Sequence, residues 1–238
     1  MVYLYGLHAC FAALGNPRRK VERVWCTESV GRKLDDTSFV ASISAPQKYY
    51  ISDKKKLDSL VNEVHQGIVI QAHPLLTEPI SIVKSSKMDL VVVLDQVTDP
   101  QNVGSILRLC RVFGAGALIM ARARSPAETG AIAKVASGAL ELVPRCIVSN
   151  IADGIRQLKE FGYWSVGLAE DSSQSIRELD FSGKIALIMG SEGAGIRRLT
   201  KELCDFTAFI PTSAEFSTLN VTTATAIALY EACSRDRI

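Results

Sequence analysis

KIALIMGSEGAG, residues 184–195, joins a continuous apolar run to a glycine-rich loop with a glutamate in its middle. Three similar apolar runs precede it: LVVVLD (90–95), ALIMA (117–121) and WSVGLA (164–169). Segments with helical periodicity, such as NVGSILRLCRVFG, alternate with these runs. Apolar strands that alternate with helices are typical of a parallel sheet covered on both faces. The sequence therefore predicts an α/β fold for residues 89–238.

The first third of the chain has a different pattern. Residues 1–75 contain a potential helix, YGLHACFAAL, and two potential strands, KVERVWCT and HQGIVIQAH, separated by polar loops. The stretch HPLLTEPISIVKSSKMD contains two prolines and a polar Ser/Lys cluster, which makes residues 76–88 the candidate linker. We therefore expect a small α/β domain over 1–75, a linker over 76–88 and a larger domain over 89–238.

Charge is nearly balanced over the 238 residues, with 27 Lys and Arg against 25 Asp and Glu. The distribution is uneven, because residues 1–75 carry ten basic and seven acidic side chains. The basic clusters are RRK (18–20) and KKK (54–56). Such clusters usually form a solvated surface, and they also suit contact with nucleic acid.

The six cysteines and three histidines lack the spacing of a disulfide framework or a metal site. Several cysteines lie in apolar stretches, which indicates buried thiols in a reducing compartment. The N-terminus does not resemble a signal peptide, and no apolar stretch reaches the ~18 residues of a membrane span. We expect a cytoplasmic protein that binds neither a metal nor a membrane.

Ligands of a parallel sheet bind at the carboxyl ends of its strands, where three loops carry polar residues. In the first loop, after residues 90–95, Asp99-Pro100 marks a turn and Asn102 is placed to cap the next helix. Arg108 lies off the apolar face of that helix. An ordinary helix cap and a surface arginine explain this loop as well as a binding site does.

The second loop is GSEGAG (190–195). It matches neither G-x-x-x-x-G-K-[ST] nor G-x-G-x-x-G, and Glu192 would repel a phosphate. A glycine-rich loop with a carboxylate suits a ligand that has hydroxyl groups or a positive charge, such as S-adenosylmethionine. Alternatively, Glu192 is an ordinary glutamate in the first turn of a helix, where the helix dipole favours it.

The third loop places Ser217, Thr218 and Asn220 directly before an apolar helical segment. Helix capping accounts for one of these polar residues but does not require three within four positions. Each loop alone is ambiguous, whereas three polar loops at strand ends of one sheet indicate a functional site.

Together the three loops resemble the motifs of the SpoU family of RNA ribose 2′-O-methyltransferases, in the SPOUT superfamily. The motif N-x-G-x-x-x-R is present as NVGSILR (102–108), and G-[AS]-E-G-x-G as GSEGAG. The third motif, S-L-N-V-S-x-A, is present as TLNVTTA (218–224). Residues 1–75 resemble, more loosely, the RNA-binding domain of the members that act on large-subunit rRNA.

The resemblance implies a parallel sheet with a C-terminal trefoil knot, a rare exception to unknotted topology. It also implies S-adenosylmethionine as cofactor, RNA as substrate and a homodimer with the site at the subunit interface. The catalytic residues that it implies are Arg108, Asn102, Glu192, Asn220 and Thr218. The cofactor contacts that it implies are Gly190, Ile210, Leu219, Gly193 and Gly195.

In the family, the arginine that matches Arg108 is proposed to activate the ribose hydroxyl. Because a guanidinium is effectively always protonated, positioning a phosphate or stabilising charge is the simpler role for it. Asn102 and Glu192 would orient Arg108 and the substrate, and Asn220 would hold the first-motif segment and the cofactor loop. Two departures from the motifs are Thr218 in place of serine and Ala214 in place of glycine.

Large-subunit rRNA is the first candidate substrate, in particular one of its guanosines. A tRNA methyltransferase is the runner-up, although members of that subgroup more often lack a domain like residues 1–75. A non-catalytic RNA-binding or ribosome-assembly factor on the same fold is the alternative from another class. A nucleotide-dependent oxidoreductase is disfavoured, because no G-x-G-x-x-G follows the first apolar run.

Overall fold

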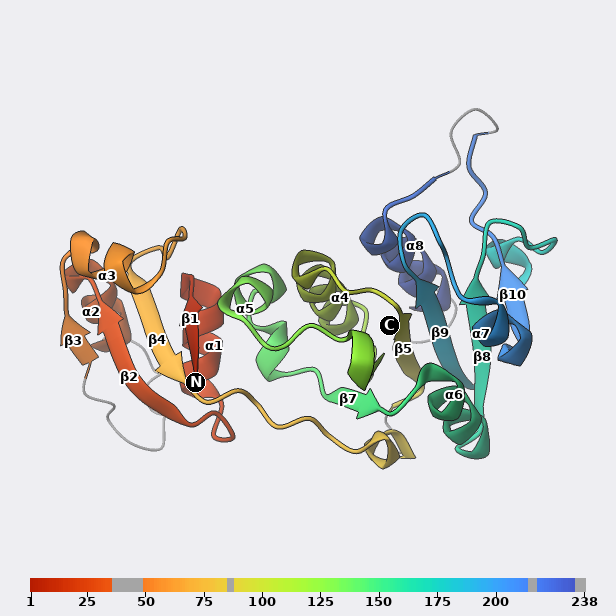
Figure 1. Cartoon of the computed structure of the whole chain (residues 1–238), viewed down its shortest axis with the longest axis horizontal. Coiled ribbons are helices and arrows are strands. Elements are labelled where there is room, and N and C mark those ends of the chain that lie inside the picture. Colours follow the sequence, from red (N-terminus) through yellow and green to blue (C-terminus); the bar gives the residue numbers. More distant parts are fainter. Residues whose placement is uncertain (36–48, 85–87, 214–217, 234–238) are drawn as a thin grey trace. The chain divides into compact units, whose positions relative to one another are not determined.

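A computed structural model, drawn in Figure 1, describes residues 1–35, 49–84, 88–213 and 218–233. The chain forms two compact units. The first comprises Met1–Leu76 and Ala127–Leu142, and the second comprises Thr77–Pro126 and Val143–Ile238. Each unit contains a sheet of its own.

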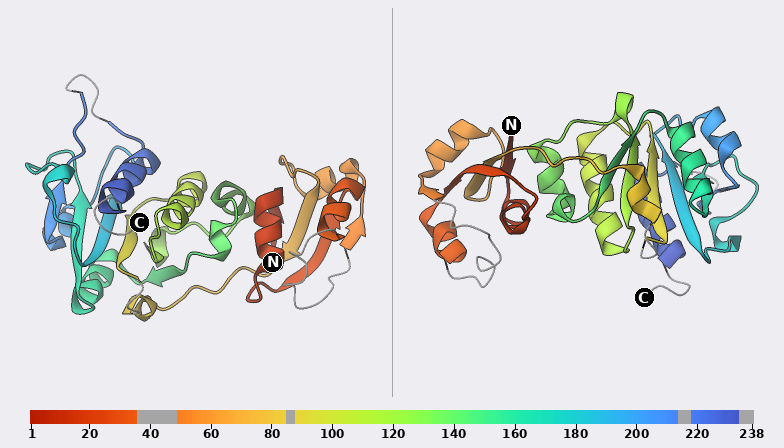
Figure 2. Two further views of the ribbon diagram at one scale, coloured as in Figure 1. Left: turned by 180° about the vertical axis from the view of Figure 1, so that it is seen from behind. Right: turned by 90° about the horizontal axis from the view of Figure 1, so that it is seen from below.

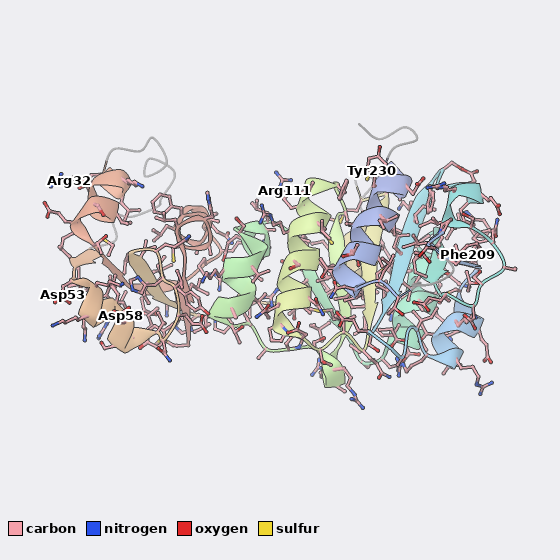
Figure 3. The ribbon with its side chains drawn as sticks, turned by 90° about the horizontal axis from the view of Figure 1, so that it is seen from above. Arg32, Asp53, Asp58, Arg111, Phe209 and Tyr230 are labelled. Atoms are coloured by element: carbon pink, nitrogen blue, oxygen red, sulfur yellow. The ribbon has the colours of Figure 1, made fainter. Side chains whose placement is uncertain are left out.

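The first unit has a four-stranded mixed sheet in the order β1-β4-β2-β3. Its strands are β1 (Val2–Tyr5), β2 (Val21–Cys26), β3 (Tyr49–Ile51) and β4 (Ile68–Ala72). Its first three α-helices are α1 (Leu7–Gly15), α2 (Glu28–Asp35) and α3 (Lys54–Leu60). Helices α1 and α2 lie on one side of the sheet and α3 on the other, as Figures 1 and 2 show. Figure 3 shows the same division, with Arg32 of α2 far from Asp53 and Asp58 at α3.

A segment distant in sequence completes this unit. It contains helix α5 (Gly130–Ala136) and the 3₁₀ turn η4 (Ala139–Glu141). Helix α5 packs on β1 and α1, and η4 packs on α1. The helix over YGLHACFAAL and the two strands expected within residues 1–75 are confirmed as α1, β2 and β4. Strands β1 and β3 and the contribution of this segment were not predicted.

A buried charge cluster ties this segment to the rest of the first unit. The guanidinium of Arg19 lies 2.5 Å from a carboxylate oxygen of Glu128 and 2.5 Å from one of Glu141. Glu141 also accepts a hydrogen bond from the side-chain amide of Asn16, at 2.7 Å. The three charged side chains are at most 2% exposed. Burial by itself lowers the pKa of Arg19, but the two glutamates more than offset this and raise it.

The second unit has a six-stranded sheet in which every neighbouring pair is parallel, in the order β10-β8-β9-β5-β6-β7. The four predicted apolar runs are confirmed as β5 (Leu90–Asp95), β6 (Ala117–Ala121), β8 (Tyr163–Leu168) and β9 (Lys184–Gly190). The two edge strands, β7 (Arg145–Val148) and β10 (Phe206–Ala208), were not predicted. A parallel α/β fold is therefore confirmed.

Helices cover both faces of this sheet, which explains why its strands are apolar throughout. On one face, α4 (Pro100–Val112) packs on α8 (Val221–Cys233). On the other, α6 (Ile151–Glu160) packs on α7 (Arg198–Leu203), as Figures 1 and 2 show. Short 3₁₀ turns form η2 (Ile80–Lys84), η3 (Arg122–Arg124) and η5 (Ile176–Glu178). The core under α6 contains the following buried residues: Val91, Val93, Ile119, Ile188, Ile151, Ile155 and Leu158.

All six cysteines are free thiols, five of them buried and Cys204 half-buried, as their apolar surroundings predicted. Burial raises the pKa of the Cys110 thiol to about 12, so this thiol stays protonated at neutral pH. Within the described ranges, no helix is long and apolar enough to cross a membrane. The same residues contain no group of three or more His, Cys, Asp or Glu side chains that could hold a metal ion.

Candidate functional site

The start of α4 determines what Asn102 does. Asp99 caps this helix, because its carboxylate accepts from the backbone N–H of Gln101 at 3.1 Å and of Asn102 at 3.4 Å. Pro100 occupies the first turn, where a missing N–H costs nothing. The prediction that Asn102 caps the helix is therefore wrong. Because α4 begins earlier, the Asn102 side chain is available for other contacts.

Glu192 brings the three motifs together. One of its carboxylate oxygens, Oε1, accepts from the side-chain amide of Asn102 at 2.8 Å and from that of Asn220 at 2.5 Å. Asn102 lies in the first turn of α4, Glu192 in the loop after β9, and Asn220 directly before α8. Asn102 lies 90 residues before Glu192 and Asn220 lies 28 residues after it, so one carboxylate joins three separate segments.

Thr222 completes this network. Its hydroxyl donates to Oδ1 of Asn102 at 3.2 Å, and its backbone N–H donates to Oδ1 of Asn220 at 2.8 Å. Each asparagine therefore donates through its amide nitrogen and accepts through its amide oxygen, which fixes the orientation of both side chains. Thr222 was not among the predicted site residues. Thr222 lies two residues after Asn220, and a capping side chain accepts from the backbone N–H at this position. That spacing in the sequence could have identified Thr222.

The glycine-rich loop folds back on the end of β9. Ser191 and Gly195 form an antiparallel bridge, with N–O distances of 3.2 and 2.9 Å. A Cβ atom at Gly190 would overlap the backbone of Gly195 and Ile196, so only glycine fits there. Gly193 has a φ of +80°, which L side chains rarely adopt. Because α7 begins only at Arg198, the interpretation of Glu192 as a first-turn residue of a helix is wrong.

A pocket of about 580 Å³ opens beside this loop. Its lining includes all five expected cofactor contacts, Gly190, Gly193, Gly195, Ile210 and Leu219. It also includes two of the expected catalytic residues, Glu192 and Thr218. The segments before and after the glycine loop, and the chain that leads into α8, therefore form one cavity at the carboxyl end of the sheet.

Asp95, which was not predicted as a site residue, anchors the far end of the glycine loop. This carboxylate is fully buried at the end of β5, in register with Gly190 on β9. It accepts from the backbone N–H of Arg197 at 3.0 Å and from its Nε at 2.8 Å. The loop is thus held at one end by the strand pairing of Gly190 and at the other by Arg197. An acidic residue at the end of an apolar strand was the signal in the sequence.

Arg108 stands apart from this network. It is exposed on α4 and does not line the pocket. Among the described residues it makes no hydrogen bond or ion pair, so the structure does not bring it to Asn102 or Glu192. Ser217 and Ala214 lie outside the described residues.

Two family models match the chain. That of the SpoU rRNA Methylase family matches residues 89–230. The chain belongs to the SpoU family. A second model, for RNA 2′-O ribose methyltransferase substrate binding, matches residues 3–77 of this SpoU chain. The matched ranges cover both the three motifs and the N-terminal domain expected from the sequence.

Curated relatives of this SpoU chain carry the name 23S rRNA (guanosine-2′-O-)-methyltransferase RlmB. The protein from Pseudomonas putida is 35% identical, with 99% of this chain and 97% of the relative covered. The protein from Coxiella burnetii is 36% identical, with 96% and 93% covered. The match thus extends over nearly the full length of both relatives.

Solved structures share the SpoU fold. The methyltransferase AviRb from Streptomyces viridochromogenes, in complex with AdoMet, has a TM-score of 0.79 at 22% identity, with 98% of this chain and 89% of AviRb covered. An rRNA methyltransferase from Sinorhizobium meliloti has a TM-score of 0.79 at 23% identity, with 97% and 86% covered. The whole two-unit chain therefore has structural counterparts.

Proposed function

We propose that this chain transfers a methyl group from S-adenosylmethionine to the ribose 2′-hydroxyl of a guanosine in 23S rRNA. The observation that carries the proposal is the position of Glu192, which joins Asn102 to Asn220 while its own loop lines the pocket. The two curated relatives are named for this reaction. Family, fold and site chemistry thus support the same activity.

The pocket suits the chemistry of S-adenosylmethionine. Apolar side chains such as Leu168 and Met189 can contact an adenine ring, and the loops offer backbone groups to ribose hydroxyls. The carboxylate of Glu192 favours a sulfonium cation and disfavours a phosphate. We propose that the cofactor is held by the backbone of Gly190, Ile210 and Leu219, with Gly193 and Gly195 closing the loop beside it.

When bound, S-adenosylmethionine supplies an electrophilic methyl group. A ribose 2′-hydroxyl is a poor nucleophile, so the protein must orient it and assist the loss of its proton. The role proposed for Arg108 is to hold the ribose or a neighbouring phosphate and to stabilise the charge that develops on the oxygen. Asn102, Glu192 and Asn220 keep the cofactor loop in place, and Thr218 lines the pocket beside them.

A homodimer is part of the proposal, because Arg108 is exposed and has no contact with the pocket of its own chain. The neighbouring helices α4 and α8 also carry large exposed apolar side chains, Val112 at 66% and Tyr230 at 61% exposure. In Figure 3, Tyr230 lies on the same side of the second unit as Arg111 of α4. Packing of these helices against a second copy would bury both apolar groups. Sedimentation is expected to give the mass of two chains, and a monomer at micromolar concentration would contradict this.

Two further properties remain proposals. A C-terminal trefoil knot is proposed from the family, because the SpoU model matches residues 89–230 and the resemblance to SpoU enzymes implies a knot. Crystallographic tracing of residues 206–233 would test the knot.

A cytoplasmic location is supported by six free thiols, and cell fractionation would test it.

Methyl transfer from labelled S-adenosylmethionine is the direct test of the function. Unmodified 23S rRNA is expected to gain one labelled 2′-O-methylguanosine, whereas tRNA gains none. Label in tRNA alone would contradict the choice of rRNA and favour the tRNA enzyme. No label in either RNA, with RNA binding intact, would favour a non-catalytic RNA-binding factor.

A further inference from the structure

We propose that an aromatic row on the sheet of the first unit binds unpaired RNA bases by stacking. The row consists of Tyr3 on β1, Trp25 on β2 and Tyr50 on β3. This proposal rests on the proposed RNA substrate and assigns the surface that would hold unpaired nucleotides of that substrate. The ligand of this surface is single-stranded RNA.

The three rings lie next to one another. The ring centre of Trp25 is 6.4 Å from that of Tyr3 and 6.4 Å from that of Tyr50. The planes of the Tyr3 and Trp25 rings are inclined to each other by 37°, and those of the Trp25 and Tyr50 rings by 32°. Tyr3 is 38% exposed and Tyr50 is 54% exposed, so both ends of the row are open to a ligand.

The alternation of side chains along the strands explains why the rings share a face. Their neighbours along the strands, Leu4, Val24 and Cys26, are buried and point to the opposite face. The face of the rings is covered only in part, by α3, whose Leu57 packs on Tyr5 and Val69 with Trp25 at the edge of the cluster. Trp25 is therefore anchored on one side by the protein, while its two neighbours in the row remain open.

Single exposed apolar side chains are common on protein surfaces and need no explanation. Three adjacent aromatic rings from three strands are a different feature, because they form one continuous platform. Every nucleic-acid base has a flat face that can stack on such a ring, and bases are free to do so only where they are unpaired. A platform of this kind therefore suits single-stranded RNA.

The charges around the row are complementary to RNA. Arg23 lies two residues before Trp25 on β2, is exposed, and among the described residues has no ion pair or hydrogen bond from its side chain. Helix α3, which lies on the same face, begins with three exposed lysines, Lys54, Lys55 and Lys56. Phosphate groups next to the stacked bases would be attracted electrostatically to these four cations.

Three acidic side chains, Asp53, Asp58 and Glu63, lie at or after α3 and offset part of this charge, so the four cations leave a small positive excess. Asp53 caps the helix by accepting from the backbone N–H of Lys56 at 2.8 Å, and Asp58 lies 3.0 Å from Nε2 of His65. A protein partner is the less favoured occupant, because lysine is depleted in the interfaces between proteins. Aromatic rings beside unpaired cations are instead the combination found in single-strand RNA sites.

The substitution Tyr50→Ala tests this proposal in the full-length protein. Binding of a fluorescent single-stranded fragment of 23S rRNA is measured by anisotropy, and binding of a duplex of the same sequence is measured beside it. Loss of one stacking ring is expected to raise the Kd for the single strand by roughly five- to a hundredfold. Tyr50→Phe keeps the ring and is expected to keep the affinity.

Ile51→Ala is the matched control, because Ile51 follows Tyr50 on β3, is 56% exposed and points to the other face. Equal affinities of the wild type, Tyr50→Ala and Ile51→Ala would overturn the proposal, as would equal binding of duplex and single strand by the wild type. The readout does not depend on methyl transfer. A selective loss of binding in Tyr50→Ala would support the aromatic row even if the chain proved to be non-catalytic.

Discussion

The substitution Arg108→Ala is expected to reduce methyl transfer to 23S rRNA by about a hundredfold or more, a loss typical for removal of one group that stabilises developing charge. The affinity for S-adenosylmethionine is expected to stay unchanged, because the proposed cofactor contacts are backbone groups of Gly190, Ile210 and Leu219 and do not include Arg108. Single-turnover kinetics would measure the transfer step, and calorimetry would measure cofactor binding. The two readouts separate a role in catalysis from a role in binding the cofactor.

Arg156→Ala is the control for this experiment. Arg156 is an exposed arginine of the same unit that pairs with Asp153 on α6, and an exposed pair contributes little to stability. Its removal is expected to leave both readouts unchanged. Cofactor affinity that fell together with the activity of Arg108→Ala would contradict the proposed role and make Arg108 part of the cofactor site.

The substitution Arg19→Met is expected to lower the free energy of unfolding of the first unit by about 3–5 kcal/mol. It leaves the carboxylates of Glu128 and Glu141 buried, each at most 2% exposed, without the guanidinium that compensates their charge. Urea unfolding followed by fluorescence and circular dichroism would measure the loss.

Arg32→Met is the comparison, because Arg32 pairs with Glu28 on the surface of α2. Its loss is expected to cost less than about 1 kcal/mol. A double substitution, Arg19→Met with Glu141→Leu, is expected to recover part of the stability, since it removes one of the uncompensated charges. Equal small costs for Arg19→Met and Arg32→Met would show that the buried cluster contributes no more than a surface pair.

Local patterns in the sequence predicted the central sheet well. Strands β5, β6, β8 and β9 are continuous apolar runs because helices cover both faces, and that environment leaves a clear pattern. The edge strands were missed for a physical reason. Strand β7 starts with the charged Arg145, and β10 is three residues long with an exposed Phe206, so neither shows a distinct apolar run.

The candidate site was predicted in its residues but not in its contacts. Motif spacing pointed to Asn102, Glu192 and Asn220, whose side chains meet in the structure. The capping role of Asn102 was wrong because Asp99 is an equally good cap three residues earlier, and the sequence alone does not choose between them. Asp95 was missed because its partner, Arg197, lies 102 residues away.

The first unit could not be outlined from local sequence for the same reason. Arg19 and Glu141 are 122 residues apart, and no periodicity or spacing links two residues at such a distance. Residues 1–75 contain helices and strands with clear patterns, so they look complete as a domain. The segment that closes the unit lies beyond the first two strands of the other sheet.

This arrangement has a consequence for how the chain is made. A ribosome that has reached Leu76 must add 66 more residues, through Leu142, before it has produced every part of the first unit. At roughly 5–20 residues per second, that takes about 3–13 s. During this interval Arg19 has been synthesised and its two carboxylate partners have not, while β5, α4 and β6 of the second unit are being synthesised. Translation therefore starts the second unit before it can finish the first.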